Sequence, residues 1–302
     1  MVWSWLMDRP AFLLDFYDWA LVRLTGPDAR EFLQGVGTQD ITTFRPDVAS
    51  PTLFLSEKGR PVALAWVVLD REGEGVTLFV EPGGREALLP HLERLRVMED
   101  VTVTGPNGMP RLYGVAGRDR SAVARNWATA LPGAEAIHAA QVTFLLLPPG
   151  AEKPGGVMSL LASAASPEWL EAWRISAGIP RAGVDFDSDR IATELSLPEA
   201  ISLDKGCYVG QEVVARTTHR GAVRRRRIGF LYSAQAGILP RGTELRAGGA
   251  PSGFITSTAL EPGTGRGLGM GYLTTEALQN PVEVLAIQDT TTTHLEVAPW
   301  PL

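Results

Sequence analysis

"KGCYVGQEVVAR", residues 205–216, contains the only cysteine in a chain of 302 residues. Gly206 and Gly210 flank Cys207, and glycine permits unusual backbone angles and the close approach of a ligand. Lys205 precedes the thiol, and Gly210 is expected to open a helix over "QEVVARTTH". A nearby cation and a helix N-terminus both stabilise a thiolate, so Cys207 and Lys205 are the candidate catalytic residues. The alternative is a cysteine that packs as a small buried apolar residue.

The segment before the motif, "DFDSDRIATELS" at 185–196, begins like a calcium-binding loop with alternating aspartates. Its sixth position is Arg190, where such a loop needs glycine, and its twelfth is Ser196, where it needs a bidentate glutamate. The segment therefore indicates an acidic surface loop. Glu194 is a separate case, because it lies in an apolar context just ahead of the motif, and it is a candidate for a binding role.

An arginine run follows the motif: "RGAVRRRR", 220–227, has five arginines in eight residues. Charge runs of this kind are commonly a solvated face or a linker. The formal net charge of the chain is -6, which argues against bulk nucleic-acid binding, since that function usually leaves a basic domain or stripe. Nucleic acid is therefore not an expected partner, and an RNA-associated protein with strongly salt-dependent binding remains a third hypothesis.

The composition excludes several classes of site. One cysteine rules out an internal disulfide and a zinc or iron-sulfur site built from cysteines of one chain. The four histidines are scattered without metal-ligand spacing, so no metal site is predicted. The N-terminus lacks the basic region of a signal peptide, and no apolar run approaches transmembrane length. We therefore expect a cytoplasmic protein with no membrane partner.

The pattern of the whole chain predicts an α+β fold that ends in a separate β module. Three strand-like runs, "PTLFLS", "PVALAWVVLD" and "GVTLFVE", are separated by turn-rich segments and indicate an antiparallel meander. Strands and helices then alternate without long crossovers up to about residue 155. From Ile228 onward, short runs spaced by glycine and proline turns predict a small antiparallel β-barrel.

The motif "KGCYVGQE" resembles the K-G-C-[FY]-x-G-Q-E signature of the folate-binding YgfZ-type proteins, relatives of the aminomethyltransferase of the glycine cleavage system. Other matches agree in order and spacing: "FLQGVGTQD" at 32–40, "LSEKGRPVA" at 55–63, "WRISAGIPRAGVD" at 173–185 and "ARTTHRG" at 215–221. Residues 80–155 and the barrel match only in pattern. The resemblance thus extends over most of the chain.

This resemblance implies a GcvT-like three-part fold. A discontinuous first domain of residues 1–48 and 156–225 carries the motif, a ferredoxin-like α+β domain of residues 49–155 is inserted into it, and a β-barrel occupies residues 226–302. The resemblance also implies tetrahydrofolate as cofactor and a role in assembling or repairing iron-sulfur clusters, with Cys207 as the essential thiol. The expected partners are folate and iron-sulfur client or assembly proteins, and a monomer is expected.

Folate recognition calls for two kinds of contact. A carboxylate can accept paired hydrogen bonds from the pterin, and an arginine can hold the glutamyl tail in a bidentate fork. Glu194 is the candidate acid, displaced from the position that many relatives use, and whether it replaces their acid is open. The candidates for the tail are Arg216, Arg220 and Arg224. The motif adds the remaining cofactor-binding candidates: Tyr208, Gly210, Gln211 and Glu212.

The predicted function is a tetrahydrofolate-binding accessory protein for iron-sulfur proteins, which need not turn over a substrate. The alternative is an enzyme, a folate-dependent aminomethyltransferase or related one-carbon transferase. Such chemistry calls for preorganised acids around the folate. The most distinctive motif of this chain centres on a thiol instead, which favours the accessory role.

Overall fold

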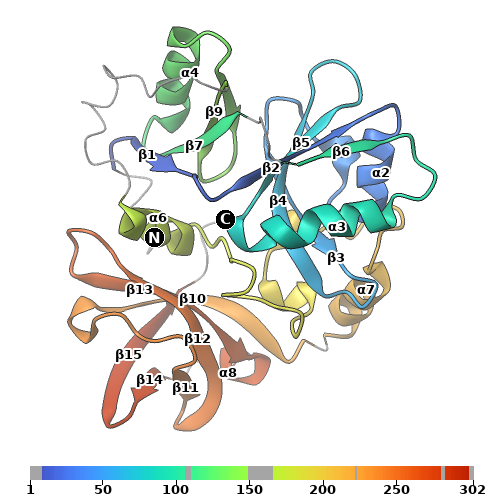
Figure 1. The fold of residues 1–302 in the computed structure, drawn as a ribbon. Helices are drawn as coiled ribbons and strands as arrows, with labels where there is room; N and C mark the ends of the chain where they lie inside the picture. Colours follow the sequence, from blue (N-terminus) through green and yellow to red (C-terminus); the bar gives the residue numbers. More distant parts are fainter. Residues whose placement is uncertain (1–8, 106–109, 149–165, 222, 280–282, 299–302) are drawn as a thin grey trace.

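The structure is a computed structural model that describes residues 9–105, 110–148, 166–221, 223–279 and 283–298. Helices and strands mix along these ranges, which confirms the predicted α+β class. Two open sheets form the upper part of the molecule, and a barrel lies below them (Figure 1). Within the described ranges no helix is long and apolar enough to cross a membrane.

A five-stranded antiparallel sheet forms most of the N-terminal half. Its strands in spatial order are β3 (Ser50–Leu55), β4 (Pro61–Leu69), β5 (Val76–Val80), β2 (Ala20–Thr25) and β6 (Thr102–Thr104). β3, β4 and β5 are the predicted meander, which is confirmed. α2 (Ala29–Val36) and α3 (Arg85–Leu95) share one core with this sheet, because each helix turns an apolar stripe toward it.

Alternate residues of β4 face two different cores. Val67 packs with the helices, whereas Trp66 and Val68 pack on the opposite face. This follows from the two-residue period of a strand. Because both faces are covered, β4 reads as one continuous apolar run.

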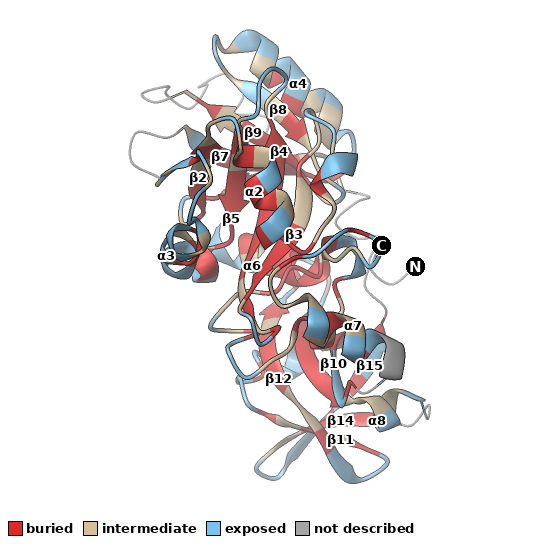
Figure 2. Ribbon diagram, turned by 90° about the vertical axis from the view of Figure 1, so that its right-hand side faces the viewer, coloured by how far each residue is buried: buried red, intermediate tan, exposed pale blue. Residues whose placement is uncertain are grey.

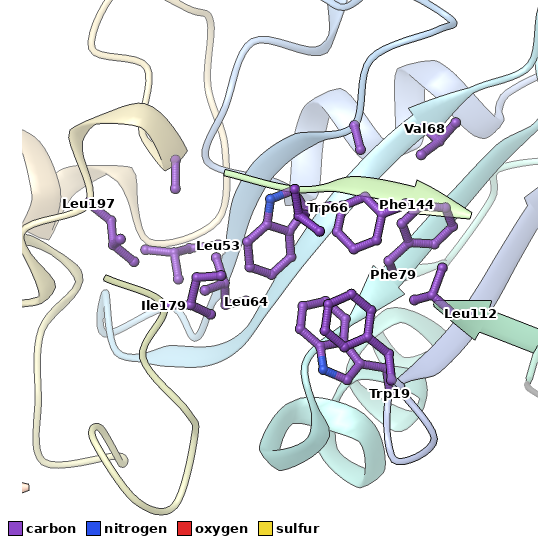
Figure 3. Packing of buried hydrophobic residues seen from close by; sticks show 14 of the residues in the cluster. Trp19, Leu53, Leu64, Trp66, Val68, Phe79, Leu112, Phe144, Ile179 and Leu197 are labelled. Atoms are coloured by element: carbon purple, nitrogen blue, oxygen red, sulfur yellow. The ribbon is translucent and has the colours of Figure 1, made fainter. Parts of the chain in front are cut away.

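A second, four-stranded antiparallel sheet packs toward the opposite face of the first sheet. Its strands in spatial order are β1 (Phe12–Asp15), β7 (Arg111–Ala116), β9 (Thr143–Leu147) and β8 (Glu135–His138). α4 (Arg120–Ala130) packs on its outer face. Aromatic rings fill the space between the sheets (Figure 3). Trp19 lies 5.1 Å from Trp66, and Phe79 lies 4.9 Å from Phe144, between ring centres.

Both sheets combine strands from before and after residue 48. β2 pairs with β5 and β6, and β1 pairs with β7. The division into 1–48 with 156–225, 49–155 and 226–302 stays a prediction, and the strand pairing does not follow its first boundary.

The C-terminal strands close into a six-stranded barrel, which confirms the predicted barrel. Its strands in spatial order are β10 (Arg225–Ser233), β13 (Arg266–Thr274), β12 (Ala250–Leu260), β11 (Glu244–Ala247), β14 (Val284–Gln288) and β15 (Thr291–Ala298). A Cβ atom at Gly267 or Gly269 would overlap the ring of Tyr232 or Phe230. The glycines of β13 therefore give room to the aromatic rings of β10.

α6 (Pro167–Ser176) lies between the sheets and the barrel and contacts the cores of both (Figure 1). Its buried Arg174 donates to Asp185 Oδ2 at 2.5 Å and to Ser257 Oγ at 2.9 Å. Asp185 Oδ1 accepts from Ser257 and from Thr256 of β12, both at 2.6 Å. Although burial opposes it, the Asp185 carboxylate raises the pKa of Arg174 above its usual value. A buried ion pair therefore joins α6 to the barrel.

Candidate functional site

The motif loop, residues 202–210, is hydrogen-bonded to the segment at the end of α2. Ser202 N–H donates to Thr38 O at 3.0 Å. Val209 N–H donates to Gly35 O at 3.2 Å. These bonds fix both ends of the loop that carries the cysteine.

Lys205 is buried, and its ammonium Nζ donates three hydrogen bonds to backbone carbonyls. The acceptors lie at the end of α2 and just beyond it, on Gln34 at 2.6 Å, Gly37 at 2.7 Å and Gln39 at 2.9 Å. Burial lowers the pKa of Lys205 to about 8, and the Asp40 carboxylate opposes this shift. The three bonds use the three N–H groups of the ammonium. Lys205 thus joins the motif loop to α2, and its part in thiol chemistry stays a prediction.

Cys207 is exposed to solvent, whereas its neighbours Lys205 and Tyr208 are buried. The Lys205 Nζ atom lies 5.2 Å from the centre of the Tyr208 ring. Burial raises the pKa of Tyr208 to about 12, so its hydroxyl stays neutral at physiological pH. The loop is therefore anchored by two side chains and presents the thiol between them.

Gly210 begins α7 (Gln211–Arg220) in the left-handed region, with φ of 82°. A Cβ atom here would lie 2.7 Å from Ser56 O, so glycine is required both by the backbone angle and by the neighbouring turn. Gln211 Oε1 accepts from Tyr208 N–H at 3.3 Å. Both candidates hold the start of the helix, which confirms the helix expected after Gly210.

A cavity of about 590 Å³ lies beside the motif loop, and Leu203 belongs to both. The cavity is bounded by the end of α6, the segment 192–203, α7 and the start of β10, and Figure 2 shows α7 directly above β10. Its walls are mainly apolar, with a few polar groups that include Thr193, Glu199 and Arg226. Ligand sites commonly have this combination of size and lining.

The folate-binding residues predicted on α7, and Arg224 of the arginine run, do not line this cavity. Glu212, Arg216 and Arg224 are exposed, and none of them is among its lining residues. Arg220 ends α7, and its side chain lies outside the described part of the chain. Their predicted contacts with folate therefore stay predictions without support from the cavity.

Two carboxylates lie near the cavity. Glu194 is buried, accepts from Ile191 N–H at 3.3 Å and lies 3.9 Å from Arg190, while its neighbour Thr193 lines the cavity. Glu199 lines the cavity itself. Glu199 is an exposed residue, yet partial desolvation raises the pKa of its carboxyl above the usual value, and the charge of an arginine of β10 opposes the shift.

That arginine is Arg227, which sequence reasoning missed. It is buried and lines the cavity, and it donates from Nε to Leu195 O at 2.7 Å and from Nη1 to Gly178 O at 2.8 Å. Burial lowers its pKa to about 10. Arg227 therefore fixes the cavity wall, while the neighbouring Arg226 is exposed at the lining.

A wider cleft of about 1030 Å³ lies between the two open sheets. Its lining includes the ion-paired Arg23 and Asp70 but no residue of the motif loop or α7. The cavity beside the motif loop is therefore the candidate functional site.

The fold has a counterpart among enzymes of glycine cleavage. The crystal structure of glycine cleavage system aminomethyltransferase T from Bartonella henselae matches 99% of this chain and 88% of that chain with a TM-score of 0.79. The two sequences are 18% identical over that match, so the likeness shows the fold. The GcvT-like fold predicted from the motif is confirmed.

Sequence comparison identifies the family. The chain is 32% identical over 239 residues to the tRNA-modifying protein YgfZ of Cronobacter sakazakii, covering 72% of this chain and 70% of that protein. It is 31% identical over 254 residues to the tRNA-modifying protein YgfZ of Escherichia fergusonii, covering 78% and 76%. A scan against protein-family models finds no match. The chain belongs to the YgfZ family.

Proposed function

We propose that this protein binds tetrahydrofolate in the cavity beside the motif loop and uses the Cys207 thiol to support iron-sulfur proteins. The observation that carries the proposal is the position of the exposed thiol on an anchored loop that also lines the cavity through Leu203. A volume of about 590 Å³ suits a ligand of folate size, and the apolar walls suit its flat rings.

The polar groups of the cavity match the two ends of a folate. Glu199 can accept paired hydrogen bonds from the pterin amino group and ring N–H, and Arg226 can hold a tail carboxylate in a bidentate fork. Glu194, the acid favoured by the sequence, lies one residue beyond the lining residue Thr193. Glu194 and Glu199 are therefore competing candidates for the carboxylate that binds the pterin.

A matched pair of variants tests folate binding and separates these assignments. Titration calorimetry with tetrahydrofolate should give saturable heat for the natural protein, and ligand binding should raise its unfolding temperature. Glu199→Gln should weaken binding by about one to two orders of magnitude, because a charged hydrogen-bond partner is lost. Glu194→Gln should leave the dissociation constant nearly unchanged. The reverse order would assign the pterin to Glu194, and no heat with the natural protein would remove folate from the proposal.

The thiol would act transiently. A single thiolate cannot hold a cluster that normally takes four protein ligands. It can instead share a cluster edge with a client, or attack a disulfide of a client to form a mixed disulfide while the second client sulfur leaves as a thiolate. Cys207→Ser should leave folding and folate affinity nearly intact while it abolishes support of iron-sulfur enzymes in cells that lack the natural protein. Full restoration of those enzymes by the serine variant would contradict this role.

Binding of RNA is a second candidate function. The curated relatives are named tRNA-modifying proteins, and four arginines are exposed here: Arg216 on α7, Arg224 just before β10, and Arg225 and Arg226 at its start. Electrostatic binding predicts that affinity for tRNA falls steeply with salt and weakens when Arg224 and Arg225 are both changed to serine. An aminomethyl-transfer assay with folate present measures the enzymatic alternative in the same preparation.

A further inference from the structure

A third hollow, the α2–α3 groove, is lined by residues of α2, of the end of α3 and of the motif loop, and its volume is about 480 Å³. Its apolar lining comes from three separate parts of the chain: Phe32 and Val36 of α2, Leu95 at the end of α3 with Met98 in the loop just beyond it, and Val209 of the motif loop. None of these five residues lines the cavity proposed for folate.

An ordered loop holds apolar side chains in solvent at the edge of this groove. Val97 is 81% exposed and Met98 is 92% exposed. Glu99 Oε2 accepts from the N–H groups of both residues, at 2.9 and 3.0 Å, so the loop is fixed in this form. Exposed apolar residues beside a hollow mark interaction surfaces, and methionine adapts its shape to varied partners.

The groove and the thiol belong to one hydrogen-bonded unit. Val209, which lines the groove, donates its N–H to Gly35 O at 3.2 Å. Lys205, on the other side of Cys207, donates to the carbonyls of Gln34 and Gly37, which lie on either side of Gly35. A segment seated in the groove would therefore contact the loop that presents Cys207.

The charge of the rim defines the chemistry of the occupant. Asp28, Glu31 and Glu99 are the charged residues of the groove lining, and all three are acids. We propose that the α2–α3 groove docks a segment of a partner protein in which apolar side chains are flanked by lysine or arginine, and so brings that partner to Cys207. The inference rests on the proposed function only in assuming that the docked partner then uses Cys207. Binding in the groove itself requires no folate.

Labelled peptides test the docking without folate. The probe is a short fluorescein-labelled amphipathic peptide with leucines on one face and lysines on the other, and its counterpart carries glutamates in place of the lysines. Fluorescence anisotropy at physiological salt should detect binding of the basic peptide and none of the acidic one. Met98→Asp should weaken the basic peptide about tenfold, because a buried apolar contact is lost.

Ile238→Asp is the matched control, because Ile238 is 57% exposed on the distant barrel and the substitution adds the same charge. It should leave the affinity unchanged. Unchanged or tighter binding by Met98→Asp would show general attraction to a chain of net charge -6 and would overturn the proposal. Self-association of the natural protein that Met98→Asp abolishes would also overturn it, because the occupant would then be a second copy.

Thiol exchange tests the position of the bound peptide. The basic peptide is given a terminal cysteine activated as a mixed disulfide with thionitrobenzoate. The Cys207 thiolate attacks the peptide sulfur, a protein–peptide disulfide forms, and thionitrobenzoate leaves with the electron pair of the broken bond. This release should be about tenfold faster than with the acidic peptide at the same concentration, and Met98→Asp should remove the advantage. Equal rates for both peptides would refute delivery to Cys207, whatever the result of the folate titration.

Discussion

Replacement of Lys205 by methionine should destabilise the protein strongly. The ammonium donates three hydrogen bonds to carbonyls of Gln34, Gly37 and Gln39, and methionine can donate none. A hydrogen bond from a charged group contributes about 1.5–3 kcal/mol, and three bonds on one group are not additive. We therefore expect Lys205→Met to reduce the free energy of unfolding by about 3–5 kcal/mol in urea titrations.

Lys58→Met is the matched control, because Lys58 is exposed in the turn before β4 and should change the free energy of unfolding by less than about 0.5 kcal/mol. A loss below about 1 kcal/mol in Lys205→Met would refute the anchoring role, because water would then be replacing the ammonium. Alkylation of Cys207 at neutral pH gives a second result. If the ammonium serves the carbonyls, the rate should not fall in the variant, whereas a fall would indicate that Lys205 activates the thiol.

Two further substitutions test buried parts of the fold. Burial raises the pKa of Glu81 from 4.5 to about 7, so the folded protein holds a proton that the unfolded chain releases, and the free energy of unfolding falls as pH rises between these values. This loss should reach about 3 kcal/mol by pH 7.5 in urea titrations, and Glu81→Gln should not show it. Parallel pH profiles of the natural protein and this variant would contradict the account. Gly210→Ala should cost about 2–3 kcal/mol in the same titrations, because its Cβ would meet Ser56 O from a left-handed backbone, whereas Gly206→Ala has open space and should cost little. Equal losses for the two glycines would refute that account.

Local patterns predicted the fold where structure depends on neighbours in the sequence. The β3–β5 meander and the barrel follow from strand-like runs separated by turn residues, and both are present. The pairing of β2 with β5 could not be predicted in the same way, because the two strands are separated by α2 and the whole of β3 and β4. Only the resemblance to a known family supplied the overall GcvT-like fold.

The sequence predicted the loop that carries the thiol, but it did not predict which residues line the cavity. The motif marked the exposed Cys207, but the acceptors of Lys205 lie more than 160 residues away, so its proximity in sequence to the thiol gave no sign of them. The arginine run could be recognised in the sequence, but the burial of its members could not. β10 begins within the run and places Arg227 in the interior. Glu199 gave no signal at all, because a short 3₁₀ turn places it at the cavity.

The ion pair between Arg174 and Asp185 limits how this protein could have evolved. The barrel supplies both hydroxyl groups that bond Asp185 Oδ1, from Thr256 and Ser257. A lineage that exchanged the barrel for another module would leave a buried charge short of partners, at a cost of several kcal/mol. A replacement barrel would therefore have to bring its own hydroxyls to the same carboxylate.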